Sequence, residues 1–171
     1  MNPMQKIMVE KISLNMGTGG PGAELEKALK LLQKVSNRKP VETKTQKRIP
    51  TWGLRPGLAI GAKVTLRGKD AVELLKRLLR AVDNNLPDSK FDDQGNFSFG
   101  VPEYINIPEV TYDAGLGIIG FEVAVTLKRP GFRIKRRKIR QQKIPAKHRI
   151  TKEQAIDFVK KEFGIDIGAE K

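Results

Sequence analysis

The sequence predicts an α+β fold in which a mainly antiparallel sheet carries helices on one face and leaves the other face open. Two periodic patterns predict it. Apolar and polar residues alternate along residues 8–16, 59–67 and 119–127, as in strands with one buried side. Apolar residues recur at helical spacing along residues 24–36, 70–82 and 155–163. The two patterns together predict strands whose apolar sides pack under helices, with their polar sides outward.

The composition favours one domain over residues 1–171 and restricts the chemistry available to it. The chain has no cysteine and one histidine, so we expect no disulfide, no thiolate metal site and no cluster of histidine ligands. No apolar run approaches the roughly 20 residues that span a bilayer. The first residues lack the apolar core of a signal peptide, so a cytoplasmic protein without a membrane partner is expected.

The charge of the chain points to a polyanion as partner. Lys and Arg number 33 against 19 Asp and Glu, which gives a net charge of +14. Residues 123–152 contain twelve Lys and Arg and no carboxylate, whereas residues 86–113 contain six carboxylates and one Lys. Charge sorted into blocks predicts separate surfaces for separate partners. The alternative is a solvated basic surface with no such partner.

The first third of the chain predicts a strand, a turn, a helix and a short strand. In the first strand Ile12, Leu14 and Met16 face inward, and the residues between them face outward. A glycine-rich turn covers residues 17–22. The helix that follows ends at Asn37, and Pro40 then directs residues 41–45 into an extended conformation.

The second third predicts a basic loop, a strand and a helix. Residues 44–57 form the loop, and the strand of residues 59–67 follows it with a cationic polar side. This polar side is suited to phosphate and sugar. Asp70 is expected to open the second helix in a capping box with Glu73, and Asn84 and Asn85 to end it.

The last third predicts short strands within residues 91–112, a strand over residues 119–127, and an extended basic arm over residues 128–149. Thr151 and Gln154 form a second capping box that opens the third helix, and Gly164 ends it. The arm and this helix make up the C-terminal segment, residues 128–171.

The turn GTGGPG at residues 17–22 fits the pattern G-x-G-x-x-G, and Glu42 follows at the spacing of a dinucleotide fold. A nucleotide-dependent enzyme is therefore the alternative from a different functional class. A parallel central strand would be apolar on both sides, however, and the first strand is polar on one side. A tight turn that requires small residues is the favoured interpretation.

Three further features have a structural interpretation beside a functional one. Trp52 is either a packing anchor or a stacking platform for a nucleotide. His148 lies in a basic run, so its functional interpretation is a contact to a phosphate or a base, and the sequence offers it no catalytic partner. The carboxylates of the acidic block have no metal-binding spacing, so a solvated turn or a protein contact is favoured over magnesium.

Several motifs together resemble the family of large-subunit ribosomal protein five. They are KISLNMG (11–17), KPV (39–41), LRPG (54–57), IGAKVTLRG (60–68), FD (91–92), GN (95–96) and PEVTYD (108–113). RPGF (129–132) and KHRI (147–150) resemble the archaeal and eukaryotic branch. The motifs follow the family order over nearly the whole chain.

The resemblance implies a structural protein that binds 5S ribosomal RNA in the central protuberance of the large subunit. The family's contacts to that RNA include an asparagine and a threonine, matched here by Asn15 and Thr65, and a glutamine that is replaced here by Arg38. The family's long loop reaches the peptidyl-site tRNA, and here it is residues 44–57. An intersubunit bridge and neighbouring ribosomal proteins, including those of the small-subunit head, are further implied partners.

The candidate site residues therefore fall into three groups, with no catalytic residue, metal ligand or cofactor among them. The rRNA-binding group is Lys11, Ser13, Asn15, Arg38, Lys39, Lys63, Thr65 and Arg67. The tRNA-facing group is Lys44, Lys47, Arg48, Trp52 and Arg55. The arm, expected to lie on ribosomal RNA or to anchor near tRNA, contributes Arg129, Arg133, Lys135, Arg136, Arg137, Lys138, Arg140, Lys147, His148 and Arg149.

Overall fold

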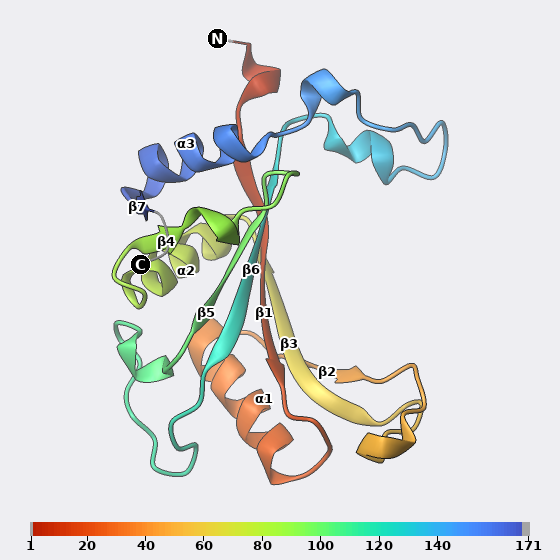
Figure 1. Ribbon diagram of the computed structural model, residues 1–171, viewed down its shortest axis with the longest axis vertical. Helices are drawn as coiled ribbons and strands as arrows, with labels where there is room; N and C mark the ends of the chain where they lie inside the picture. The colour runs from red at the N-terminus through yellow and green to blue at the C-terminus, as the bar shows by residue number, and fades with distance from the viewer. Residues whose placement is uncertain (1, 169–171) are drawn as a thin grey trace.

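The chain folds around a five-stranded antiparallel sheet, as described for residues 2–168 by a computed structural model (Figure 1). The strand order is β2 (Val41–Lys44), β3 (Ala59–Arg67), β1 (Met8–Gly17), β6 (Phe121–Lys128) and β5 (Phe97–Val101). Each neighbouring pair is antiparallel. The predicted α+β class is confirmed. Met1 and residues 169–171 lie outside the described residues. The predicted C-terminal segment, residues 128–171, is therefore described only as far as residue 168.

Three α-helices lie on one side of the sheet: α1 (Ala23–Ser36), α2 (Lys69–Arg80) and α3 (Lys152–Phe163) (Figure 1). The predicted alternation explains this arrangement. Ile12 and Leu14 of β1 and Val123 of β6 are fully buried beneath the helices, and the residues between them face the other side. One face of the sheet therefore holds the core, and the opposite face is left for contacts.

The capping box predicted at the start of α2 is wrong. Gly68 occupies the N-cap position with a φ of 73°, and no side chain caps this helix. Asp70 instead forms an ion pair with Arg38, which lies far from it in the sequence. The helix also ends earlier than predicted, because Asp83 and Asn84 adopt left-handed conformations in the turn after Ala81.

The last described segment of the chain pairs with a segment from the middle of the sequence. The capping box of Thr151 and Gln154 opens α3 as predicted, and Gly164 ends the helix with a φ of 64°. The chain then forms β7 (Asp166–Gly168), which pairs in parallel with β4 (Asn85–Pro87). Neither short strand was predicted, since three residues are too few to show a period.

The topology excludes a dinucleotide fold at the glycine turn. β1 lies between β3 and β6 and is antiparallel to both, whereas in that fold the first strand pairs with parallel neighbours in a mostly parallel sheet. The turn instead joins β1 to α1 at one end of the sheet.

Candidate RNA interface

Six of the predicted rRNA-binding residues lie side by side on the open face of the sheet. The antiparallel register of β1 and β3 sets them in three cross-strand pairs: Lys11 with Arg67, Ser13 with Thr65, and Asn15 with Lys63. The hydroxyls of Ser13 and Thr65 lie 3.4 Å apart and share a hydrogen bond. All six side chains are exposed or half-buried. We call this set of six residues the polar platform.

Arg38 and Lys39 border the polar platform where β2 stops and the edge of β3 becomes accessible. Together with Lys63, Thr65 and Arg67 they line a hollow of about 470 Å³. The Arg38 guanidinium donates a hydrogen bond to the Asp70 carboxylate, which fixes its position at this edge. The structure therefore brings all eight predicted residues to one continuous area.

The loop of residues 44–57 extends from one end of this area. It contains a short 3-10 helix, η2 (Pro50–Trp52), and is closed by a bridge between Ile49 and Leu54. Leu54 is its buried residue, whereas Trp52 is 72% exposed, so the interpretation of Trp52 as a packing anchor is wrong. The four cations of the tRNA-facing group are also exposed on this loop: Lys44, Lys47, Arg48 and Arg55.

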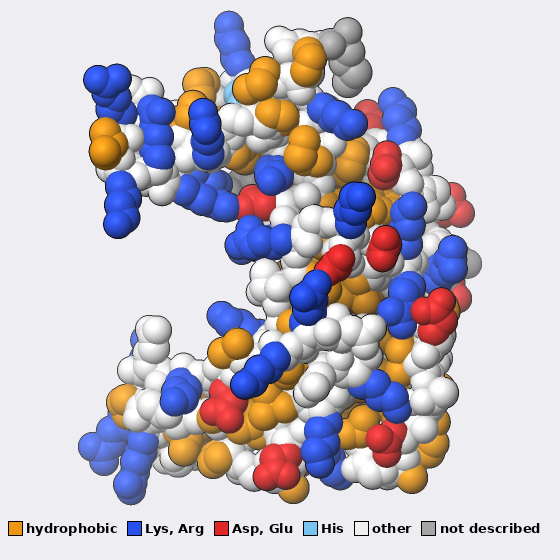
Figure 2. All heavy atoms as spheres, turned by 180° about the vertical axis from the view of Figure 1, so that it is seen from behind, with side chains coloured by type: hydrophobic (Ala, Val, Ile, Leu, Met, Phe, Trp, Pro, Cys, Tyr) orange, Lys and Arg blue, Asp and Glu red, His pale blue; other side chains and the backbone are white. Residues whose placement is uncertain are grey.

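The basic arm, residues 128–149, projects from the opposite end of the sheet on the same side as this loop (Figure 1). It contains two short 3-10 helices, η5 (Phe132–Lys135) and η6 (Ala146–His148). Figure 2 shows Lys and Arg side chains on both projections and a broad hollow between them. A polyanion lying on the polar platform would therefore meet cations at both ends.

Two residues of the arm hold its base in place. Arg129 is buried and donates to the Arg149 carbonyl oxygen and, at 2.8 Å, to Oε1 of Gln154. The ring of His148 lies 2.8 Å from the Pro130 carbonyl oxygen and edge-on to Phe132. These contacts give both residues an internal role. The other predicted cations of the arm are exposed, as is Lys143: they are Arg133, Lys135, Arg136, Arg137, Lys138, Arg140, Lys147 and Arg149.

Comparison with known proteins assigns the chain to a family. Residues 2–55 match the family model described as ribosomal protein L5, and residues 59–158 match the model that describes the C-terminus of the same ribosomal family. The large ribosomal subunit protein uL5 of Nanoarchaeum equitans is 49% identical over 97% of this chain and 98% of its own. The chain belongs to the ribosomal protein L5 family.

Two further archaeal members of the L5 family show similar agreement. The uL5 protein of Sulfurisphaera tokodaii is 46% identical over 98% of this chain and 95% of its own, and that of Methanosphaera stadtmanae is 41% identical over 98% and 99%. L5 proteins are structural proteins of the ribosome, so this chain is a ribosome-associated cytoplasmic protein and not an enzyme. The resemblance seen in the sequence motifs is thereby confirmed.

Glu10 of this L5-family chain is a further residue of the site that was not predicted from the sequence. Its carboxylate forms ion pairs with Arg136 of the arm and, at 3.4 Å, with Arg67 of the polar platform. Burial raises the pKa of Glu10, but Arg136, Lys128 and Arg67 outweigh that effect and hold the pKa below the usual 4.5. A β-bulge between Val9 and Lys11 interrupts the alternation here. The available signal was a carboxylate at a position that alternation assigns to the core.

Within residues 2–168, no three acidic or histidine side chains come together as metal ligands. None of the helices in the same range is long and apolar enough to cross a bilayer.

Proposed function

We propose that this chain binds 5S rRNA through its open sheet face and helps to seat that RNA in the central protuberance of the large subunit. The observation that carries the proposal is the polar platform: three register-fixed pairs of polar side chains on a rigid sheet, between two basic projections. Folded RNA is recognised through its shape, its 2′-hydroxyls and its exposed bases, for which fixed hydroxyl and amide groups are suitable partners.

The surrounding cations supply the part of the affinity that does not depend on sequence. Lys11, Lys63 and Arg67 lie within the platform and Arg38 and Lys39 at its edge, where each can neutralise a phosphate. Asn15 and Thr65 supply hydrogen bonds that depend on the geometry of the RNA. Affinity and selectivity thus come from neighbouring residues on the same two strands.

The two projections are assigned to other parts of the ribosome. We propose that the loop of residues 44–57 contacts the peptidyl-site tRNA, because it combines four exposed cations with an exposed aromatic ring on which a base can stack. The basic arm is assigned to large-subunit rRNA. The acidic block of residues 86–113 is assigned to neighbouring proteins, including the small-subunit head at an intersubunit bridge. In this proposal residues 1–171 act as one domain.

The experiment that tests the main proposal is capture of RNA by the purified chain from total RNA at matched salt. The wild type should retain 5S rRNA selectively over tRNA and over fragments of the larger rRNAs. A variant with Asn15→Ala and Thr65→Ala should lose that selectivity and keep a weaker, salt-sensitive affinity for all RNA. Equal retention of every RNA by the wild type would contradict the proposal.

A further inference from the structure

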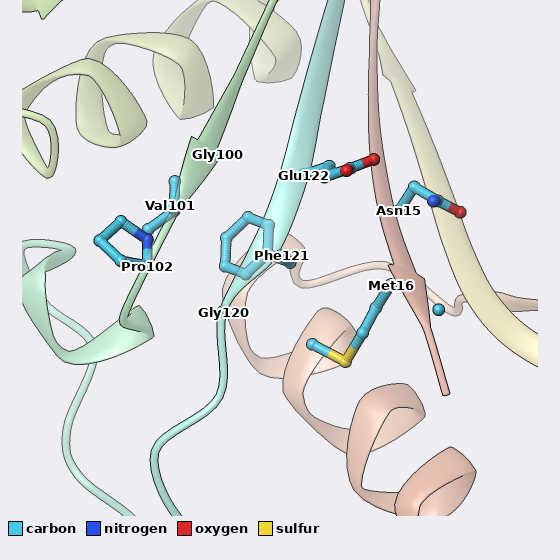
Figure 3. Close-up of a pocket in the computed structure, with 9 residues that line it drawn as sticks. Asn15, Met16, Gly100, Val101, Pro102, Gly120, Phe121 and Glu122 are labelled. Atoms are coloured by element: carbon cyan, nitrogen blue, oxygen red, sulfur yellow. The ribbon is translucent and has the colours of Figure 1, made fainter. Parts of the chain in front are cut away.

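A hollow of about 590 Å³ opens at the end of the sheet where β1 and β5 finish and β6 begins, next to the polar platform (Figure 3). Its outward-facing positions are occupied by two polar residues, Asn15 and Glu122, and by three glycines, Gly17, Gly100 and Gly120. Met16, Val101 and Phe121, which alternate with them, are buried. The hollow therefore exposes the sheet backbone beside one amide and one carboxylate.

Glu122 is the anomaly in this surface. It is the register partner of Asn15, and the two side chains extend on the same side of the sheet (Figure 3). Glu122 is exposed, and no hydrogen bond or ion pair joins its carboxylate to any residue in the described range 2–168. A negative charge beside a cationic platform repels phosphate and accepts hydrogen bonds, so a group that binds at this point should offer hydrogen-bond donors.

The glycines show that the hollow is not a by-product of tight packing. A Cβ atom at Gly17 or Gly100 would meet nothing within 4 Å, and neither residue has the left-handed φ that favours glycine. Gly120 differs, because a Cβ there would lie 2.5 Å from the Pro102 carbonyl oxygen. Internal structure thus requires glycine at position 120 but not at 17 or 100. At these two positions the missing side chains leave room for a group from outside.

We propose that the hollow receives an unpaired guanine of 5S rRNA, with the Glu122 carboxylate accepting hydrogen bonds from its N1–H and its N2 amino group. This inference rests on the proposed binding of 5S rRNA to the open face. Guanine is the base that offers two adjacent N–H donors on its pairing edge, matching the two oxygens of a carboxylate. The glycines let the flat ring approach the backbone, and the Asn15 amide lies beside it. Splayed bases in RNA loops are read in this manner.

The test is analogue interference with 5S rRNA transcripts in which inosine randomly replaces guanosine, since inosine lacks the N2 amino group. Inosine at one guanosine should weaken binding to the wild type. Glu122→Gln should weaken binding of unsubstituted 5S rRNA by about tenfold, which is within the range for losing one well-matched base contact. The variant should also abolish the inosine effect at that guanosine. Its unfolding transition should match that of the wild type, because the side chain is exposed.

The control is Glu42→Gln, which makes the same change of charge on the same sheet. Glu42 is exposed, and its register partner Ala62 is buried, so Glu42 lies toward the helix-covered side. This variant should bind 5S rRNA as well as or slightly better than the wild type. General electrostatics predicts the same small gain for Glu122→Gln, which is the opposite sign to the proposal.

Equal or tighter binding by Glu122→Gln, or an inosine effect that persists in that variant, would overturn the guanine contact and leave 5S rRNA binding standing. A carboxylate that serves a protein partner would give this same result. If the wild type retained 5S rRNA no better than other RNA, the proposed function would fail, and the guanine contact with it.

Discussion

Arg136 of the basic arm forms an ion pair with Glu10, at the β-bulge of the central strand β1. The Glu10 side chain is only 4% exposed, and it also contacts Arg67 of the polar platform at 3.4 Å. One buried carboxylate therefore links the arm to the surface proposed to hold RNA. Arg67 and Arg136 are each at least half exposed, so both can still reach an external phosphate.

Replacing Glu10 with Gln should destabilise the fold at neutral pH by about 1–3 kcal/mol, since charged hydrogen bonds to a buried group are lost. The pKa of Glu10 is lowered in the folded state. Its stabilisation is thus complete above the unfolded pKa, near 4.5, and is lost as the pH falls through the lower folded value. Urea unfolding at several pH values should show a gap between wild type and Glu10→Gln at pH 7 that closes at acid pH. A gap that widens on acidification would contradict this account.

Replacing Thr65 with Ala should weaken 5S rRNA binding by about 5- to 150-fold, which corresponds to about 1–3 kcal/mol for a hydrogen-bonding group buried against RNA. Thr65 is exposed in the free protein, and within residues 2–168 its hydroxyl hydrogen-bonds Ser13 alone, so stability should change little. Binding is measured by filter retention at fixed salt. Thr111→Ala is the control, since Thr111 is exposed in a loop remote from the platform. Equal affinity of both variants would remove Thr65 from the site.

The sequence was sufficient for the parts of this fold that depend on local periodicity. The predicted bounds of β3 agree with the structure residue for residue, and alternation correctly placed Asn15 and Thr65 on the same face. The fold class followed from the same patterns. Burial of alternate residues is imposed along each strand by its own sequence, so a period of two is readable without knowing the neighbours.

What the sequence did not reveal depends on contacts between distant residues. Asp70 was expected to cap α2, but Arg38 forms an ion pair with its side chain. Arg129 was grouped with the RNA-binding cations of the arm, but it is buried and donates a hydrogen bond to Gln154 of α3. The bulge that turns Glu10 toward Arg136 is set by pairing with β6. Each of these outcomes requires knowledge of which segments meet in space.

Replacing Trp52 with Ala should weaken tRNA retention in assembled ribosomes and leave 5S rRNA binding unchanged. Loss of stacking on one base costs about 1–3 kcal/mol. The indole is 72% exposed, so its removal should not lower the melting temperature. Tyr112→Ala is the matched control, because that ring is also more than half exposed but lies in the acidic region. A tRNA off-rate that is the same for Trp52→Ala and for Tyr112→Ala would argue against the tRNA contact.

Neutralising the tip of the basic arm should reduce the salt dependence of RNA binding. Lys138 and Arg140 are exposed, and their side chains form no ion pair within residues 2–168, so Lys138→Gln with Arg140→Gln should leave the fold intact. Each lost phosphate contact lowers the slope of log K against log salt concentration by about 0.7–0.9. The comparison is Lys160→Gln with Lys161→Gln on α3, away from the open face. Matching slopes for the two double variants would show that the arm tip is solvated and not bound to rRNA.

Gly61 and Gly17 face each other across β3 and β1, yet alanine should have opposite effects at the two positions. A Cβ atom at Gly61 would lie 2.5 Å from the Met16 carbonyl oxygen and 2.9 Å from Oγ1 of Thr43, so Gly61→Ala should destabilise the fold by about 1–3 kcal/mol. At Gly17 the space is open, and Gly17→Ala should leave stability unchanged or raise it slightly by restricting the unfolded chain. Chemical denaturation measures both.

The same pair of variants separates a structural role from a binding role. Gly17→Ala puts a methyl group into the hollow beside Glu122 without disturbing the fold, so it should weaken binding of 5S rRNA while the unfolding midpoint holds. Gly61→Ala should lower the unfolding midpoint. It should weaken RNA binding only because a smaller fraction of the protein is folded. If both variants lost stability to the same extent, the hollow would be a consequence of strand packing rather than a space kept for RNA.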